Sequence, residues 1–247
     1  MIRKSKRGQV TIFIIIGILI VVGVVLFFIL SGDSTEEQPQ VDVDIQPIYN
    51  YVQGCLDESV DEGIFYIAER GGYYNLSEVQ KTDILGIPYY IQNTSITMIS
   101  KQEMENQLSK SIEDDVSSCV DFKQFEDYEI KSETLTVDSS IEKEKVDVDM
   151  EFPLNIRKGE NTYQIENFKN TKQIRLGGIY DAISEYINQQ SGISEGFCIN
   201  CFLEISENYD FTVDSFDTSG GSKIFIVSDY NSKLNGEELI YSFAGRF

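Results

Sequence analysis

Apolar residues recur every three or four positions over residues 45–69, which is the spacing of an amphipathic helix. The members of this stripe are Ile45, Ile48, Val52, Leu56, Val60, Ile64 and Ile67. We expect this helix to end at Gly71 and Gly72, because glycine commonly follows the last residue of a helix. A second stripe predicts a helix over roughly 101–121. Its members are Met104, Leu108, Ile112, Val116 and Val120.

The hydrophobic period then changes to two. Val146, Val148, Met150 and Phe152 alternate with Asp147, Asp149 and Glu151. This alternation predicts an antiparallel strand with one buried and one solvated face. We expect a turn at 158–161 with a return strand after it, and a short helix at about 177–190. Three apolar segments then predict a meander at 210–216, 223–229 and 238–245.

These elements predict an α+β fold for residues 45–247, with a helical half followed by an antiparallel sheet and a short helix. Before them, residues 10–30 contain no charge and a single polar residue, Thr11. A helix of this length spans roughly 30 Å of hydrocarbon, so we predict a transmembrane helix over 9–30. Basic residues precede it and acidic ones follow, which predicts a cytoplasmic N-terminus and an extracellular domain over 45–247. Residues 31–44 are polar and acidic, so we predict a flexible stalk there.

The N-terminal stretch KRGQVTIFIII resembles the class III signal peptide of archaeal type IV pilins and archaellins. The resemblance implies that a prepilin-type peptidase removes residues 1–8 by cutting between Gly8 and Gln9, and that other pilin-like subunits or a cell-surface partner bind the mature chain. The overall plan is also similar to that of surface proteins from small archaeal genomes, for which no activity is known. Many pilins carry a glutamate where this chain has Phe13.

Composition narrows the classes of function. The formal net charge is −21, which disfavours nucleic acid as a partner through simple repulsion. The chain has no histidine, so the usual general base and the usual zinc ligand are missing. No P-loop, dinucleotide-binding fingerprint, nucleophile elbow or complete EF-hand loop is present. We therefore expect no enzyme activity, no cofactor and no metal site.

The four cysteines are expected outside the cytoplasm, where disulfides persist. Cys55 and Cys119 fall on the apolar stripes of the two predicted helices, so we predict that they pair. Closing that long loop contributes on the order of 3–4 kcal/mol in the chain-entropy model. Cys198 and Cys201 are expected to form a local disulfide that holds a turn between a helix and a strand. The alternatives are a redox-active C-x-x-C pair, a zinc site of all four cysteines, and free thiols or crossed pairing.

Three further features have two interpretations each. Asp147, Asp149 and Glu151 are a candidate Ca²⁺ site or simply a solvated strand face. The tyrosine pairs at 73–74 and 89–90 form an adhesive surface or pack in the core. Asn75 and Asn93 begin glycosylation sequons, which act only if the sites are exposed outside the cell.

The leading hypothesis for function is a membrane-anchored, pilin-like surface protein with a structural or adhesive role. The lipid bilayer and the prepilin-type peptidase are its first expected partners. The alternative is an uncleaved, signal-anchored monomer whose extracellular domain binds a ligand or a partner. An extracellular enzyme would need a cleft with paired carboxylates, for which the sequence gives no motif.

Overall fold

The computed structural model describes residues 41–76, 81–82, 86–93, 95–193 and 196–246, together with Gly17 and residues 20–22. Val41–Phe247 is one compact unit and Met1–Gln40 is the other. The helices of the larger unit are α2 (Gln46–Glu69), α3 (Lys101–Cys119), the short 3-10 helix η1 (Phe122–Gln124), α4 (Leu176–Ser191) and α5 (Ile199–Tyr209). Its strands are β1 (Tyr89–Gln92), β2 (Ser95–Ile96), β3 (Glu129–Ser132), β4 (Thr136–Ile141), β5 (Val146–Lys158), β6 (Asn161–Lys172), β7 (Thr212–Asp217), β8 (Lys223–Leu234) and β9 (Glu237–Arg246).

The fold class predicted from the sequence needs a correction. Among the described residues, no helix has both the length and the apolar character that crossing a bilayer requires. A spanning helix takes about 20 residues, whereas only Gly17 and residues 20–22 of the range predicted to span, 9–30, are described. The described part of the chain is α+β, and the transmembrane helix predicted over 9–30 is not found among its helices. Residues 1–8 and the predicted stalk up to residue 40 lie outside the described residues.

Helices α2 and α3 form where the apolar periodicity placed them. A capping bond starts α3, because the hydroxyl of Ser100 accepts the backbone N–H of Glu103 at 3.2 Å. At the end of α2, Gly71 and Gly72 adopt positive φ angles of 56° and 80°. These left-handed conformations suit glycine and let the N–H of Gly72 bond the carbonyl oxygen of Ile67 at 2.6 Å.

A disulfide joins Cys55 of α2 to Cys119, the last residue of α3. The two helices also touch directly at Gly63, where a Cβ atom would lie 3.3 Å from side-chain carbons of Leu108 and Ile112. Cys55 is buried as expected, but Cys119 is exposed, because α3 has run past the edge of the core by its last turn. The pairing is the one that the two stripes predicted, although only one of its cysteines lies in the core.

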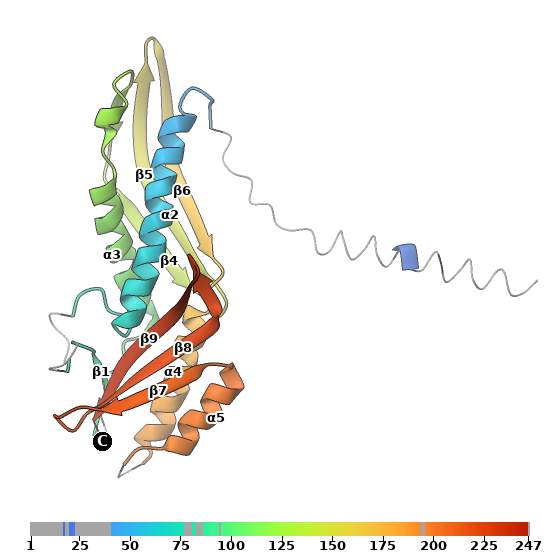
Figure 1. Ribbon diagram of the computed structural model, residues 1–247. Helices are drawn as coiled ribbons and strands as arrows, with labels where there is room; N and C mark the ends of the chain where they lie inside the picture. The colour runs from blue at the N-terminus through green and yellow to red at the C-terminus, as the bar shows by residue number, and fades with distance from the viewer. Residues whose placement is uncertain are drawn as a thin grey trace, which may run out of the picture. The chain divides into compact units, whose positions relative to one another are not determined.

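The first sheet is antiparallel and built around the long strand β5. One edge of β5 pairs with β6 along its length, and the other edge pairs with β4 and then with β3. Val146, Val148 and Met150 point into the core beneath α2 and α3, while Asp147 and Asp149 point outward. Figure 1 shows both helices running along this sheet.

The second sheet has the strand order β2-β1-β9-β8-β7. The predicted meander supplies β7, β8 and β9, and β1 joins β9 in parallel. The prediction of one antiparallel sheet was therefore wrong. Tyr90 of β1 and Tyr241 of β9 share a buried hydrogen bond of 2.5 Å between their hydroxyls, and this contact links residues far apart in the chain. Burial raises the pKa of both hydroxyls, so both stay protonated.

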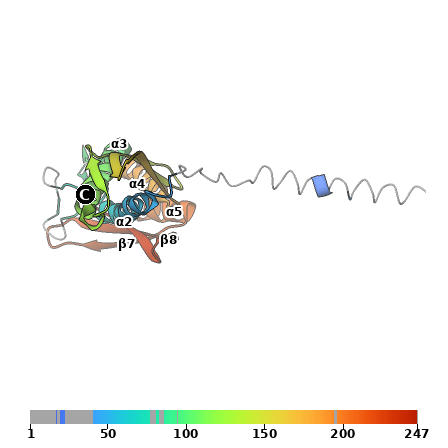
Figure 2. The same ribbon diagram turned by 90° about the horizontal axis from the view of Figure 1, so that it is seen from above.

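The sequence analysis did not predict helix α5, nor the strands β3 and β4. A turn between a helix and a strand was expected at Cys198 and Cys201, but α5 begins directly after Cys198. With α4, it covers the inner face of the second sheet. In Figure 2, β7 and β8 form one margin of the unit, with α2, α4 and α5 on their inner side.

Candidate functional site

An apolar stripe crosses the outer face of the second sheet. Ile226 and Ile224 lie two residues apart on β8 and therefore on one face. Phe216 of β7 pairs with Ile224, and Ile240 of β9 pairs with Ser228, which is also on that face. Phe216, Ile226 and Ile240 thus follow a diagonal across three strands, where neighbouring side chains are within reach of one another. We call these three residues the outer stripe.

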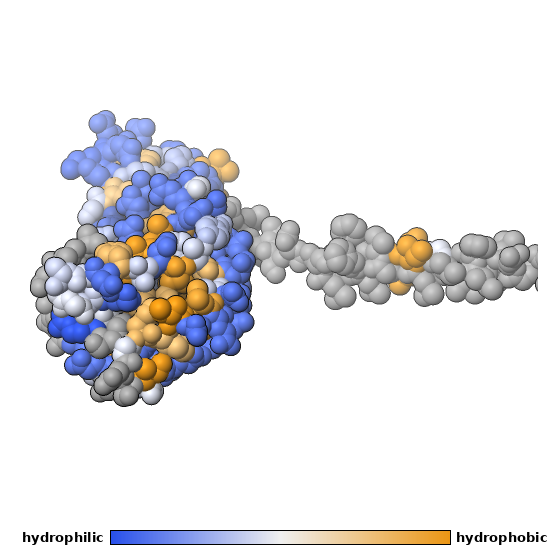
Figure 3. All heavy atoms as spheres, turned by 60° about the horizontal axis from the view of Figure 1, so that its bottom comes forward, coloured by the Kyte–Doolittle hydropathy of each residue, from blue (hydrophilic) through white to orange (hydrophobic). Residues whose placement is uncertain are grey.

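Two members of the outer stripe are open to solvent. Phe216 is 41% exposed and Ile240 is 38% exposed, while Ile226 is partly buried between them. The inner face of the same strands is closed by contrast, with Phe225, Val227 and Tyr241 in the core. Figure 3 looks onto the end of the unit where Figure 1 draws β7 and α5, and it shows apolar side chains gathered in a band between hydrophilic ones.

Acidic side chains border the outer stripe on the same face. Asp214 lies two residues before Phe216 on β7, and Glu238 lies two residues before Ile240 on β9; both are exposed. Glu238 has a loose ion pair with Lys233, with 3.6 Å between its carboxylate and the ammonium. The apolar centre therefore has acidic side chains at two points of its border, Asp214 and the lysine-paired Glu238.

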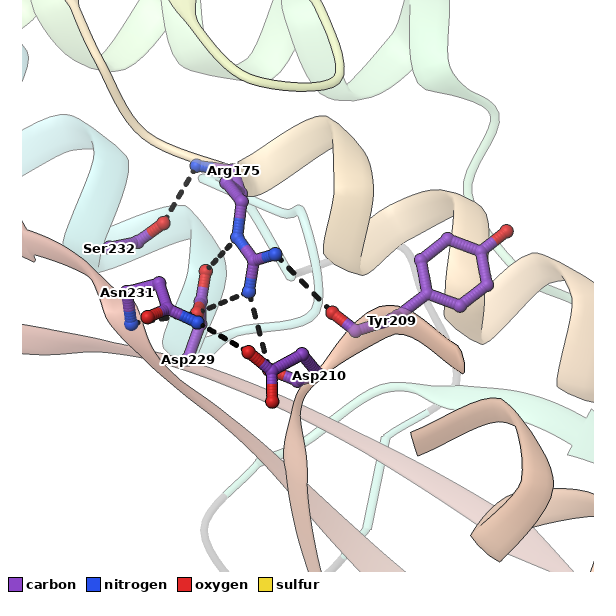
Figure 4. Close-up of polar contacts among 6 residues, drawn as sticks. All are labelled: Arg175, Tyr209, Asp210, Asp229, Asn231 and Ser232. Atoms are coloured by element: carbon purple, nitrogen blue, oxygen red, sulfur yellow. Dashed lines mark hydrogen bonds and ion pairs between the residues drawn. The ribbon is translucent and has the colours of Figure 1, made fainter. Parts of the chain in front are cut away.

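A buried ion pair lies where α4, α5 and β8 meet (Figure 4). The Arg175 guanidinium, just before α4, donates to both carboxylate oxygens of Asp229, from Nε at 2.9 Å and from Nη2 at 2.6 Å. The same guanidinium donates to the carbonyl oxygens of Tyr209 and Asp210 at 3.3 Å each. Arg175 therefore binds the last carbonyls of α5, where a cation also interacts well with the helix dipole.

Asp229 is fully buried at an irregularity in β8. Burial raises the pKa of its carboxyl, but hydrogen bonds from Arg175, Ser232 and the backbone N–H of Asn231 outweigh burial and hold the pKa below its ordinary value. A cavity of about 170 Å³ adjoins the pair and is lined in part by Lys143, Glu144 and Tyr209. Since the guanidinium is engaged by Asp229 and the α5 carbonyls, the arrangement serves to hold α5 in place.

Gln190 holds the other end of α5. Its buried side chain accepts the backbone N–H of Cys198 at 2.8 Å and donates to the carbonyl oxygen of Gly196 at 2.9 Å. Tyr186, one turn earlier on α4, also donates to the Gln190 amide oxygen at 3.2 Å. Gln190 and Arg175, near opposite ends of α4, therefore clamp the beginning and the end of α5.

The acidic row on β5 does not form a metal site in the structure. Lys145 pairs with Asp147 and Lys169 pairs with Asp149, each with 2.6 Å between the ammonium and a carboxylate oxygen. Glu151 lies beside a shallow hollow of about 480 Å³ on this face. Throughout the described ranges, no group of three or more His, Cys, Asp or Glu side chains could hold a metal ion.

The tyrosine pairs divide between the two interpretations. Tyr89 and Tyr90 are buried, so they pack in the interior, whereas Tyr73 and Tyr74 are partly exposed. The hydroxyl of Tyr74 donates to Asp114 of α3 at 3.1 Å. Tyr74 therefore stabilises the contact of the 71–76 segment with α3, and Tyr90 ties the segment to the second sheet by donating from its hydroxyl to the carbonyl oxygen of Gly71 at 2.8 Å.

The remaining sites named from the sequence have different outcomes. Cys198 and Cys201 form the second disulfide, so all four cysteines are paired and a four-cysteine zinc site is not formed. Asn75 and Asn93 are exposed, and their glycosylation stays a prediction. Gly8 and Gln9 lie outside the described residues, and cleavage between them also stays a prediction.

The sequence analysis did not single out the outer stripe or the Arg175–Asp229 pair. The run Ile224–Val227 was a usable signal, because continuous apolar runs are typical of strands buried on both faces. Here only one face is covered by helices. No protein-family model, curated protein or solved structure matches this chain.

Proposed function

We propose that the α+β unit is a partner-binding module of adhesive or structural type that works outside the cytoplasm. The outer stripe carries this proposal. Contiguous apolar side chains left open on a folded surface are typical of protein interaction sites. Phe216 and Ile240 lie on regular strands in a fixed register, so the surface is preformed and loses little conformational freedom on binding.

The charge of the chain favours a basic partner. Asp214 and Glu238 flank the outer stripe, and the net charge of the chain is −21. A second copy would bring the same acidic side chains against these, which costs free energy through like-charge repulsion. The partner that fits best is a protein whose apolar contact surface is bordered by Lys and Arg.

The two disulfides support a place outside the cytoplasm. Cys55–Cys119 and Cys198–Cys201 account for every cysteine in the chain. Disulfides persist in oxidising compartments and are rare in the reducing cytosol. The acidic surface is compatible with this place, since it keeps the module soluble until a complementary surface binds.

Binding of a defined probe tests the proposal. We would titrate a fluorescent peptide of alternating Leu and Lys with the wild-type chain and with the double variant Phe216→Ser/Ile240→Ser. Removing two exposed apolar side chains from a contact weakens binding by on the order of tenfold or more. The matched control is Ile96→Ser, which changes a residue of the same sheet that is 45% exposed but lies off the stripe.

Equal affinity of the peptide for all three proteins would contradict the proposal. So would binding that depends on salt alone, because charge without apolar contact would then explain it. Sedimentation of the proteins without peptide tests whether a second copy of the chain binds the outer stripe. A wild-type dimer that the double variant abolishes would show that the stripe binds a second copy instead of a basic partner.

The proposed processing has its own test. Intact mass and N-terminal sequencing of the protein isolated from its native cells would show whether the chain begins at Gln9. An N-terminus at Gln9 supports cleavage by a prepilin-type peptidase. An N-terminus at Met1 contradicts it and leaves the binding function of the α+β unit untouched.

A further inference from the structure

The C-x-x-C segment lies at the N-terminus of α5. Cys198 is the residue directly before the helix, and Cys201 lies in its first turn. The Sγ atom of Cys198 accepts the backbone N–H of Cys201 at 3.2 Å while the two cysteines form a disulfide. A sulfur atom in this position is aligned with the free N–H groups of the first helical turn.

This position stabilises a thiolate at Cys198. The first N–H groups of a helix and its dipole place partial positive charge at the N-terminus, and both favour a negatively charged sulfur. The other disulfide is placed in the opposite way. Cys119 is the last residue of α3, where the helix dipole disfavours negative charge, and Cys55 is buried within α2. Of the two disulfides, only Cys198–Cys201 thus has a sulfur prepared to leave as a thiolate.

Contacts other than the disulfide also hold the structure around Cys198. Gln190 binds the backbone at Gly196 and Cys198, and Arg175 binds the carbonyls at the far end of α5. The ring of Phe202, the next residue after Cys201, packs 4.3 Å from that of Tyr186, measured between ring centroids. These contacts hold α5 against the core, so we expect reduction to leave the helix in place.

The disulfide is also open to a partner. Cys198 and Cys201 are both partly exposed. Beside them on α5, Ile199 is 59% exposed and Leu203 is 56% exposed, and they lie one helical turn apart. Two exposed apolar side chains next to a disulfide provide contact area for the residues that flank cysteines in an extended polypeptide.

We propose that Cys198 and Cys201 form a thiol–disulfide exchange site that accepts electrons from a dithiol in a polypeptide. A thiolate of the polypeptide attacks Sγ of Cys198, the bond between Cys198 and Cys201 breaks, and Cys201 leaves as a thiolate that takes a proton. The second thiolate of the polypeptide then attacks its own sulfur in the mixed disulfide. Cys198 leaves as a thiolate at the helix N-terminus, and it is protonated from solvent. Two electrons and two protons pass from the polypeptide to this chain, and the polypeptide leaves with a new disulfide.

The test uses the full chain in its oxidised state and a synthetic peptide with two cysteines, each flanked by leucine. Mixed at equal concentrations without denaturant, they should yield oxidised peptide and a protein reduced only at Cys198 and Cys201, as read by alkylation and peptide mass. The rate of peptide oxidation should exceed that of the same peptide with a linear peptide disulfide by on the order of tenfold, because Cys198, which leaves in the second step, is a thiolate stabilised at the helix N-terminus. The variant Ile199→Ser/Leu203→Ser should lower the rate with the leucine-flanked peptide but not the rate with a glycine-flanked one.

Trapping identifies the sulfur that exchanges. Each single variant is first activated at its remaining cysteine as a mixed disulfide with a small aromatic thiol. The peptide thiolate should displace the aromatic thiolate from Cys198 of the variant Cys201→Ser faster than from Cys201 of the variant Cys198→Ser. Circular dichroism of both variants checks that α5 is still folded. Equal rates for the two variants, or a wild-type rate no faster than that of the linear disulfide, would overturn the proposal. Reduction at Cys55 and Cys119 before Cys198 and Cys201 would overturn it as well.

Discussion

The two disulfides lie in regions of the molecule that are held together differently. Cys55 and Cys119 are 64 residues apart and join two long helices above the first sheet. Cys198 and Cys201 are three residues apart and join one helix to its own entry segment. The first region is tied by a covalent bond between distant elements. In the second, the long-range ties of α5 are noncovalent, through Gln190, Arg175 and the aromatic core.

This difference separates structural from chemical use of a disulfide. A long closed loop restricts the unfolded chain strongly, so its crosslink stabilises the fold. A loop of a few residues restricts the unfolded chain much less. Because Arg175 and Gln190 already fix α5, the short disulfide at its N-terminus is free to exchange without loss of the fold.

The largest expected effect comes from opening the long loop. The variant Cys55→Ala/Cys119→Ala should lose about 4 kcal/mol of unfolding free energy in the chain-entropy model, with a further cost for the small cavity at the buried Cys55. Urea denaturation measures the loss. A loss no greater than that of Cys198→Ala/Cys201→Ala would erase the distinction between the two regions.

Breaking the ion pair should have the next largest effect. Arg175→Gln leaves the carboxylate of Asp229 buried without its cation, which costs about 3 kcal/mol or more. Adding Asp229→Asn in the same chain removes the charge, so the double variant should be more stable than Arg175→Gln alone. If the double variant loses the sum of the two single losses, the residues do not act as a pair.

The contribution of Asp229 should depend on pH. Because the pKa of Asp229 in the folded chain lies below its ordinary value of 3.8, its stabilising effect is present above that value and is lost as the pH falls through the folded-state pKa. The stability gap between the wild type and Asp229→Asn should therefore be wide at pH 7 and narrow below about pH 4. A gap that stays constant down to pH 2 would show that the charge of Asp229 is not the cause.

The smallest expected loss is that from the local disulfide. Cys198→Ala/Cys201→Ala should lose about 2 kcal/mol or less in the chain-entropy model, because the closed loop is so short. The near-ultraviolet circular dichroism of the aromatic core should be retained, since Phe202 and Tyr186 remain packed. Loss of that signal would mean that the disulfide, and not the contacts of Gln190 and Arg175, holds α5.

Local patterns in the sequence predicted much of the fold. Helices α2, α3 and α4, the β5–β6 hairpin and the strands β7 to β9 all follow from apolar periodicity and turn residues. The parallel pairing of β1 with β9 did not, because residues far apart in the chain decide it. Helix α5 was missed since its N-cap and first turn hold two cysteines and an asparagine, and Ile199 and Leu203 stay exposed instead of joining the buried stripe.

The candidate sites were less predictable for a similar reason. The spacing of Cys198 and Cys201 was visible in the sequence, but its placement at a helix N-terminus was not. Arg175 and Asp229 are 54 residues apart, and no local pattern connects them. The outer stripe depends on which face of a continuous apolar strand the helices cover, and that is settled only by packing.

The most direct measurement is graded reduction of the native protein. We would add dithiothreitol in small steps without denaturant, alkylate the free thiols, and locate them by peptide mass while circular dichroism follows the fold. The account predicts that Cys198 and Cys201 become alkylated first and that the folded signal persists, with Cys55 and Cys119 protected until the chain unfolds. Opening of Cys55–Cys119 first, or loss of structure as soon as Cys198–Cys201 opens, would contradict it.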